Sequence, residues 1–350
     1  MKTVLFLGAG FSRAWGLPVM QEFFQHAKDS DYLKLDEKNY LRELQSKAQK
    51  GVSMLQVGHD NLEEILSFCL ASKTFNADYP NQGDNEYDRL CNILQEVYRH
   101  IDMKKWWKEN DSLLEKLKTL FGIGIDSKKL TTNELSIITT NYDVMIEFIL
   151  SKLGWHCYLP GKWNAVVVDK KYHMAGQMCS DNKSHPLLCK LHGSLNWYSE
   201  PDDATKFQVE NAILGSYTKE LRHPKEIYLP KVSFNNYKPI RTPLIVPPTL
   251  FKMQTSPIFR VIWNEAGKAL EEAEKLVFIG FSFPKSDIYI RYFLAANLFE
   301  NVDLRTIEII DPNADKICGR LKDSNFGIHF TSRLRPIEGK WEETDYCVVD

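Results

Sequence analysis

His192, Asn141 and Asp143 have side chains that suit acid–base chemistry and the binding of a polar ligand, and each follows a short apolar run. The two runs, 135–138 and 187–191, predict buried strands. In open α/β sheets a ligand binds beyond the carboxyl ends of the strands, which is where these side chains would lie. An imidazole titrates near neutral pH and can serve as a base. We therefore expect His192 and Asn141 to line a cleft.

Each of these features also has a structural interpretation. A lone histidine is more often structural than catalytic, and polar strand ends are common. Thr139 and Thr140 could be ordinary strand-end residues, and Thr140 or Asn141 could simply cap the helix expected over 144–153. Both interpretations of the 139–143 segment stay open on these residues alone.

The first residues of the chain predict a strand followed by a glycine turn. Five apolar or β-branched residues, Thr3–Leu7, are typical of a strand buried on both faces. Gly8-Ala9-Gly10 then allows the backbone to approach a bound anion. Ser12 is placed to cap a helix over 12–26, whose N-terminus would favour a phosphate. The spacing is not G-x-G-x-x-G, since the third glycine is Gly16, so an ordinary glycine turn is an equal alternative.

A second glycine turn is expected near the end of the chain. The apolar run 275–279 is followed by Gly280 and Ser282, which repeat the order of a glycine and then a hydroxyl. Asp311 ends the next predicted strand, where dinucleotide-binding folds often place an acid on a ribose hydroxyl. Asp287, at the start of the helix expected over 286–298, belongs to the same group of candidate cofactor-binding residues.

The composition suits a globular protein of one large or two modest domains: 350 residues, 43% hydrophobic and 26% charged. A net charge of −2 gives no electrostatic indication of nucleic-acid binding. The seven cysteines include no C-x-x-C pair, so we expect neither a zinc ribbon nor a disulfide framework. We find no secretion leader and no membrane-spanning apolar run, and we expect a cytoplasmic protein.

The order of apolar runs predicts an α/β protein: a Rossmann-like parallel sheet with a large helical insertion, irregular loop covers and no zinc module. Helical spacing of apolar residues dominates the long polar section after the first helix. Short strands are expected at 244–246 and 328–330. Trp106-Trp107 is interpreted as packing, but two adjacent tryptophans cannot both face inward, so one of them is a candidate partner contact. The predicted units are a catalytic domain of 1–28 plus 134–335, an inserted helical module of 29–133, loop covers at 160–186 and 199–242, and a C-terminal surface strap of 336–350.

Four motifs in order resemble the sirtuin family. Gly-Ala-Gly-x-Ser-x-x-x-Gly-Leu-Pro at 8–18 is similar to the sirtuin cofactor motif. Thr-x-Asn-x-Asp at 139–143 and Leu-His-Gly at 191–193 are similar to its two catalytic motifs, and Gly-x-Ser at 280–282 to its second phosphate loop. The chain departs from sirtuin deacylases in lacking paired C-x-x-C zinc ligands, in having Val19-Met20-Gln21 after Gly-Leu-Pro, and in having Thr140 before the catalytic Asn. It is most similar to the zinc-free, sirtuin-like NAD-cleaving effectors of bacterial antiviral defence.

This resemblance implies a set of roles in cleaving the bond between ribose and nicotinamide in NAD. Asn141 would bind ribose hydroxyls and position water, His192 would act as general base, and Asp143 would lie near the nicotinamide amide. The remaining candidates would hold the rest of NAD: Gly8, Ala9, Gly10, Ser12, Thr139, Thr140, Gly280, Ser282, Asp287 and Asp311. With water as acceptor, the products are nicotinamide and ADP-ribose.

Three functions therefore compete. The first is an NAD glycohydrolase that depletes NAD in antiphage defence by abortive infection. The second is a zinc-free deacylase or ADP-ribosyltransferase, and the third is a sensor that binds NAD or ADP-ribose without turnover. Since an unrestrained NAD hydrolase would exhaust its host, we expect a homo-oligomer, or a partner protein that activates or restrains the enzyme.

Overall fold

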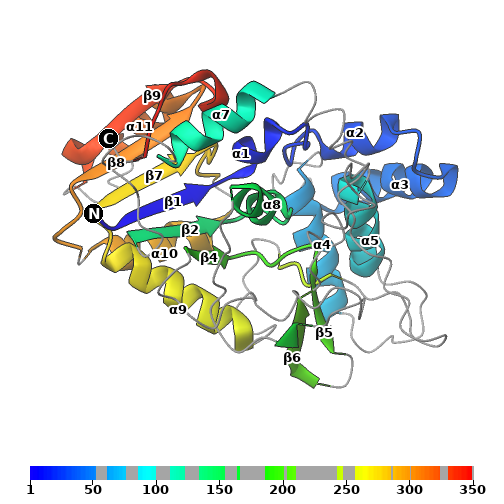
Figure 1. Cartoon of the computed structure of the whole chain (residues 1–350). Coiled ribbons are helices and arrows are strands. Elements are labelled where there is room, and N and C mark those ends of the chain that lie inside the picture. Colours follow the sequence, from blue (N-terminus) through cyan, green and yellow to red (C-terminus); the bar gives the residue numbers. More distant parts are fainter. Residues whose placement is uncertain are drawn as a thin grey trace.

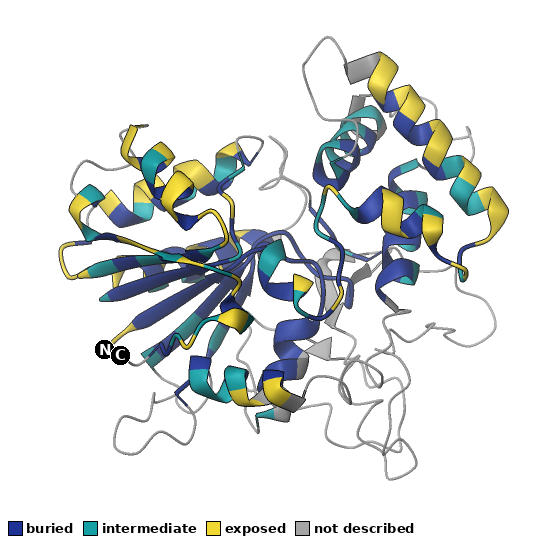
Figure 2. Cartoon of the chain, turned by 90° about the horizontal axis from the view of Figure 1, so that it is seen from above, coloured by how far each residue is buried: buried dark blue, intermediate teal, exposed yellow. Residues whose placement is uncertain are grey.

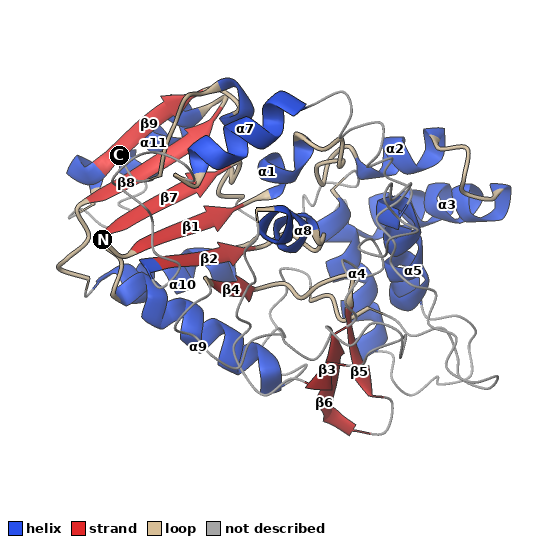
Figure 3. Cartoon of the chain, in the orientation of Figure 1, coloured by secondary structure: helices blue, strands red, loops and turns tan. Residues whose placement is uncertain are grey.

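The strands of the protein form a central sheet flanked by helices (Figures 1 and 3). The structure is a computed structural model. It describes residues 1–52, 61–75, 86–99, 111–122, 134–153, 164–165, 186–200, 203–209, 243–246, 257–284, 287–299, 301–323 and 330–348.

Within these residues, six parallel strands form the main sheet, in the order β4-β2-β1-β7-β8-β9. Counted along the chain, this is the order 3-2-1-4-5-6 of Rossmann folds, which confirms the predicted fold class. The strands are β1 (Thr3–Leu7), β2 (Leu135–Thr139), β4 (Leu187–Lys190), β7 (Lys275–Ile279), β8 (Thr306–Asp311) and β9 (Leu334–Glu338).

The central strands are buried on both faces because helices cover the sheet from both sides (Figure 2). Every residue of β1 and of β7 is buried, as the continuous apolar runs predict. The helices of the α/β core are α8 (Met145–Lys152), α9 (Pro257–Glu271), α10 (Ile288–Phe299) and α11 (Ala314–Asp323). The polar outer faces of most of these helices are exposed in the same view.

The prediction of one long first helix over 12–26 is wrong. Two short helices replace it, α1 (Ala9–Arg13) and α2 (Phe23–Asp29). Gly16 between them has a φ of +76°, a left-handed conformation that ends a helix. Ser12 lies inside α1, whose N-cap is Gly8 without a side-chain hydrogen bond, so Ser12 is not a capping residue.

Helices also fill the section predicted to be an inserted helical module. They are α3 (Leu35–Val52), α4 (Leu62–Phe75), α5 (Glu86–Arg99) and α7 (Asp111–Leu120). The group α2–α5 lies beyond the carboxyl ends of the strands, whereas α7 lies over the sheet (Figure 1). The division into a domain and a module remains a prediction, and Trp106 and Trp107 lie outside the described residues.

Two predictions for the C-terminal section are wrong. The last strand is β9 at Leu334–Glu338, while Phe330 lies in a turn. Trp341, predicted to lie in a surface strap, is buried in the short 3-10 helix η7 (Trp341–Glu343). Its indole N–H donates to the carbonyl of Phe11 at 3.1 Å and its ring stacks on Trp15 at 5.3 Å. This segment therefore packs into the core beside α1.

The loop covers are described only in part. A small three-stranded sheet is present there, formed by β3 (Asn164–Ala165), β5 (Trp197–Glu200) and β6 (Asp203–Val209). The short strand expected at 244–246 is replaced by a single bridge between Ile245 and Gly193. The rest of the predicted covers lies outside the described residues. No helix in the described part of the chain is long and apolar enough to cross a membrane.

Candidate functional site

The two glycine turns meet where the order of strands reverses, between β1 and β7. The Gly8 amide donates to the carbonyl of Ile279 and the Gly10 amide to that of Gly280, both at 3.0 Å. A Cβ added to Gly280 would lie 2.4 Å from the carbonyl carbon of Gly10. A Cβ on Gly8 would lie 2.5 Å from the Gly280 oxygen. These glycines are therefore required for turn-to-turn packing, and the amides of Gly8 and Gly10 already have acceptors.

Asn141 connects the end of β2 to the first glycine turn. Its side-chain amide donates to the Gly8 carbonyl at 2.9 Å and to the Ser12 hydroxyl at 3.1 Å. The hydroxyl of Thr139 fixes this geometry, because it donates to the Leu7 carbonyl at 2.9 Å and accepts a hydrogen bond from the backbone N–H of Asn141 at 3.0 Å. The structure thus brings Gly8, Ser12, Thr139 and Asn141 together at the carboxyl ends of β1 and β2.

Asp143 lies beside this cluster, two residues before α8. Its carboxylate accepts the backbone amide of Met145 at 2.9 Å and also a hydrogen bond from Ser12. Burial raises the pKa of Asp143, and the charge of Lys190 together with these hydrogen bonds partly opposes that rise. The helix-capping interpretation therefore applies to Asp143, whereas the amide of Asn141 is aimed at the glycine turn.

His192 follows β4 and lies between two carboxylates. Its Nε2 is 2.9 Å from Asp287 Oδ2, and its Nδ1 is 3.8 Å from Glu63 Oε1. Asp287 precedes α10 and accepts the Ile290 amide at 3.3 Å, so a helix start holds it in place. Glu63 comes from the first turn of α4. A hydrogen bond between Nε2–H and Asp287 would fix the tautomer of the ring and leave the Nδ1 lone pair to accept a proton.

The site is closed rather than an open cleft. His192 is 0% exposed, and Asn141 and Asp143 are each 7% exposed. The expectation that His192 and Asn141 line a cleft stays a prediction. Tyr142 lies over the ring of His192, with a centroid separation of 6.0 Å.

A buried lysine that the sequence analysis missed supports the loops on either side of the site. Lys190, at the end of β4, is 0% exposed, and its ammonium lies 2.8 Å from Glu147 Oε1 on α8. It also donates to the Ser194 hydroxyl at 2.6 Å and to the Asp143 carbonyl. Burial raises the pKa of Glu147, an effect that Lys190 opposes. The signal was present, because a lysine within a buried strand requires a charged partner.

Two predicted residues stand apart from this cluster. Asp311 ends β8, and its carboxylate accepts the Asn313 amide at 2.8 Å before α11. The backbone carbonyl of Ser282 accepts Arg320 at 2.7 Å, and Ser282 is exposed. Gly280 lies between them and the first glycine turn. Asp287 contacts His192, and its predicted role in holding the cofactor stays a prediction.

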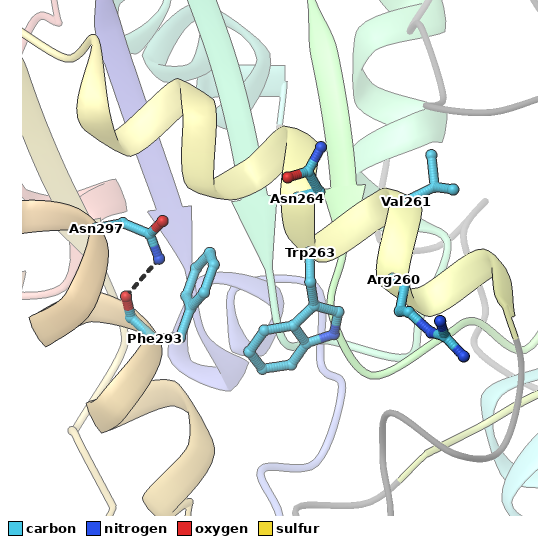
Figure 4. Close-up of a pocket in the computed structure, with 6 residues that line it drawn as sticks. All are labelled: Arg260, Val261, Trp263, Asn264, Phe293 and Asn297. Carbon is cyan, nitrogen blue, oxygen red and sulfur yellow. Dashed lines mark hydrogen bonds between the residues drawn. The ribbon is translucent and has the colours of Figure 1, made fainter.

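A separate apolar hollow lies between α9 and α10, with a volume of about 580 Å³ (Figure 4). None of the predicted site residues lines it; the lining residues are Arg260, Val261, Trp263, Asn264, Phe293 and Asn297. The Trp263 indole donates to the Leu191 carbonyl at 3.1 Å, so one wall is tied to the residue before His192. Among the described residues, no group of three or more His, Cys, Asp or Glu side chains could hold a metal ion.

No family model matches the sequence, and neither does any curated protein. Among solved structures, the chain is similar to one titled "Structure of Sir2Tm bound to a propionylated peptide". That similarity has 14% sequence identity and a TM-score of 0.28, and it covers 92% of each chain. Since a TM-score this low does not establish a common fold, the fold assignment rests on the order and direction of the strands.

Proposed function

We propose that this protein is an NAD glycohydrolase that releases nicotinamide and ADP-ribose. The observation that carries the proposal is His192, held by Asp287 at the strand ends where Asn141 meets the first glycine turn. The four sirtuin-like motifs converge on this region, although they are far apart in sequence. Ligands of open α/β sheets bind at such a reversal of strand order.

The residues fit NAD in part. Asn141, Ser12, Thr139 and Asp143 form a buried polar cluster with the kinds of group that bind a ribose, although the Asn141 side-chain amide already donates to Gly8 and Ser12 and the Thr139 hydroxyl already donates to Leu7. The amides of Gly8 and Gly10 do not fit the role of phosphate donors, because each already has an acceptor. We therefore assign a structural role to these two glycines: they shape the turn at the point where the order of strands reverses.

In the proposed reaction, His192 removes a proton from the attacking water. Nδ1 accepts this proton while Asp287 holds Nε2, and the water oxygen forms the new bond to C1′ of the ribose. The bond from C1′ to nicotinamide breaks with both electrons passing to nicotinamide, which leaves as a neutral molecule. His192 later returns its proton to solvent. Base catalysis of this kind is worth about 10²–10⁴-fold in rate.

The test is to incubate the purified protein with NAD alone and to measure free nicotinamide by chromatography. We expect release by the wild type and a loss of about 10²-fold or more in His192→Gln. His26→Gln is the matched control, because His26 lies on α2 outside the cluster. Equal release by the wild type and by His192→Gln would refute the proposal, and so would no release by the wild type at any concentration, with or without candidate partners. Transfer of ADP-ribose to a protein or an acyl-lysine would favour the transferase or deacylase alternative.

We further propose that the enzyme is an NAD-depleting effector in antiphage defence and that its activity is gated. The closed site supports gating, since His192 has no exposed surface through which to reach a substrate. The gate would be self-association or a partner protein. Light scattering and NAD turnover across a dilution series test this, and a monomer fully active at every concentration without a partner would contradict it.

A further inference from the structure

The N-terminal turn of α4 reaches from the predicted helical module to the proposed catalytic histidine. The Leu62 amide donates to the Met20 carbonyl at 3.1 Å. The side chain of Asn61 accepts the Glu63 amide at 2.9 Å. These two bonds fix the backbone at Glu63 and at the residue before it. Its side chain is then held within 3.8 Å of His192 Nδ1.

Glu63 is buried, although it is charged. It is 8% exposed and lies among the rings of Tyr98, Tyr142 and His192. Burial raises the pKa of both tyrosines, and the negative charge of Glu63 adds to that rise. A buried carboxylate is costly unless it meets a positive charge or donors. In this position, protonated His192 would supply both.

The imidazole therefore has one carboxylate at each nitrogen. A neutral imidazole carries one N–H donor, and an imidazolium carries two, one on each nitrogen. Asp287 at Nε2 can bond either the neutral or the protonated imidazole. A carboxylate at Nδ1, which can only accept, favours the protonated imidazole. That form is the one produced when His192 takes a proton from water. The titratable groups that face the ring are thus Asp287 before α10, Glu63 on α4, and the neutral phenol of Tyr142 from the loop after β2.

We propose that Glu63 is a positioning residue of the active centre, which stabilises protonated His192 and thereby makes α4 part of the catalytic machinery. This inference rests on the proposed function. Glu63 acts through His192 and not through the substrate. The segment predicted to be an inserted module then completes the active site instead of only covering it.

Glu63→Gln tests this, with Glu64→Gln as the matched control. Both residues lie in the first turn of α4, so both substitutions remove one charge from the same helix terminus. We expect Glu63→Gln to lower kcat on the order of tenfold to hundredfold with little change in KM, and Glu64→Gln to be near wild type. The acid limb of the kcat/KM profile should move to lower pH, because a neighbouring negative charge favours the protonated ring. Glu63→Asp, which keeps the charge, should recover part of the rate.

A second measurement does not depend on NAD. The ring signals of His192 can be identified by NMR among the nine histidines, because they are missing from the spectrum of His192→Gln. We expect these signals to titrate at a lower pH in Glu63→Gln than in the wild type or in Glu64→Gln. An unchanged titration, or equal kcat in Glu63→Gln and Glu64→Gln, would overturn the inference. A wild type that releases no nicotinamide would refute the proposed function, while the NMR comparison would still decide the role of Glu63.

Discussion

The Gly10 amide donates a hydrogen bond of 3.0 Å to the Gly280 carbonyl and thereby joins the ends of β1 and β7. Gly280 has a φ of +60°, and its Cα faces Gly10 so closely that neither position has space for a Cβ. The two turns therefore form a single backbone unit at the point where the order of strands reverses. Asn141 is bound to the same unit through the Gly8 carbonyl.

Gly280→Ala should destabilise the protein strongly. The new Cβ would lie 2.4 Å from backbone atoms of Gly10 and Phe11, and backbone yields less readily than a flexible side chain. We expect a loss of about 3 kcal/mol or more in the free energy of unfolding, measured by denaturant titration. Gly319→Ala in α11 is the control, since nothing lies within 4 Å of its added Cβ. It should be neutral or stabilising by up to about 1 kcal/mol, and equal costs at the two sites would contradict this packing.

Lys190→Met should be most harmful at neutral pH. It leaves Glu147 buried without its cation, a change that costs about 3–5 kcal/mol. The pKa of Glu147 is already raised by burial, and loss of Lys190 raises it further. The folded state then binds a proton that the unfolded state has released, so stability falls as the pH rises from the ordinary range of a carboxyl toward that raised pKa.

Denaturant titrations at several pH values check this prediction. The deficit of Lys190→Met relative to wild type should shrink as the pH falls and Glu147 becomes protonated. Adding Glu147→Leu should recover much of the loss at neutral pH, because no charge is then left buried in the pair. A deficit that is independent of pH would show that the ion pair is not its cause.

Asn141→Asp should reduce both NAD cleavage and stability. The two side chains have almost the same shape, but the carboxylate cannot donate to the Gly8 carbonyl or to Ser12 as the amide does. We expect a stability cost of about 1–3 kcal/mol and loss of most nicotinamide release. Asn39→Asp, at an exposed position of α3, should leave both quantities near wild type. Wild-type turnover by Asn141→Asp would remove Asn141 from the proposed catalytic centre.

Trp341→Ala should destabilise the packing around α1, the helix that contains Ser12. Trp341 is 4% exposed, its ring centroid lies 5.3 Å from those of Phe11 and Trp15, and its N–H bonds the Phe11 carbonyl. Truncation of such a buried ring costs about 3–5 kcal/mol, which a thermal or denaturant melt will show. Tyr292→Ala, at a ring that is 68% exposed, is the comparison and should change stability by less than about 1 kcal/mol. Similar losses in both variants would contradict the buried position of Trp341.

The strands that could be predicted from sequence are the interior strands of the sheet and the apolar edge strand β4. β1 and β7 are uninterrupted apolar runs because they are covered on both faces. β9 was not predicted because it is an edge strand in which exposed residues and Pro336 interrupt the apolar pattern. The first helix was extended too far because Phe23 and Phe24 belong to a second helix that follows Gly16 at helical spacing.

The residues of the proposed site could be predicted only where they directly follow the end of a strand. His192 and Asn141 were found in that way. Glu63 was not, because its partner comes from a distant segment and no local pattern records a long-range pair. The position of Lys190 within an apolar strand indicated a charged partner, but not that this partner is Glu147. Asp287 was identified as a site residue, but the role assigned to it was cofactor binding. Its position before a helix does not reveal that it faces His192.

The position of β1 in the middle of the sheet also determines when the site can form during synthesis. β1 is made first, but its two neighbours are 135–139 and 275–279, and Trp341 contacts the residue after Gly10. Contacts this distant in sequence form slowly and late. A nascent chain that still lacks β7 has no second glycine turn to hold the first. Most of the chain must therefore leave the ribosome before the site can form, so the proposed NAD cleavage would not begin during translation.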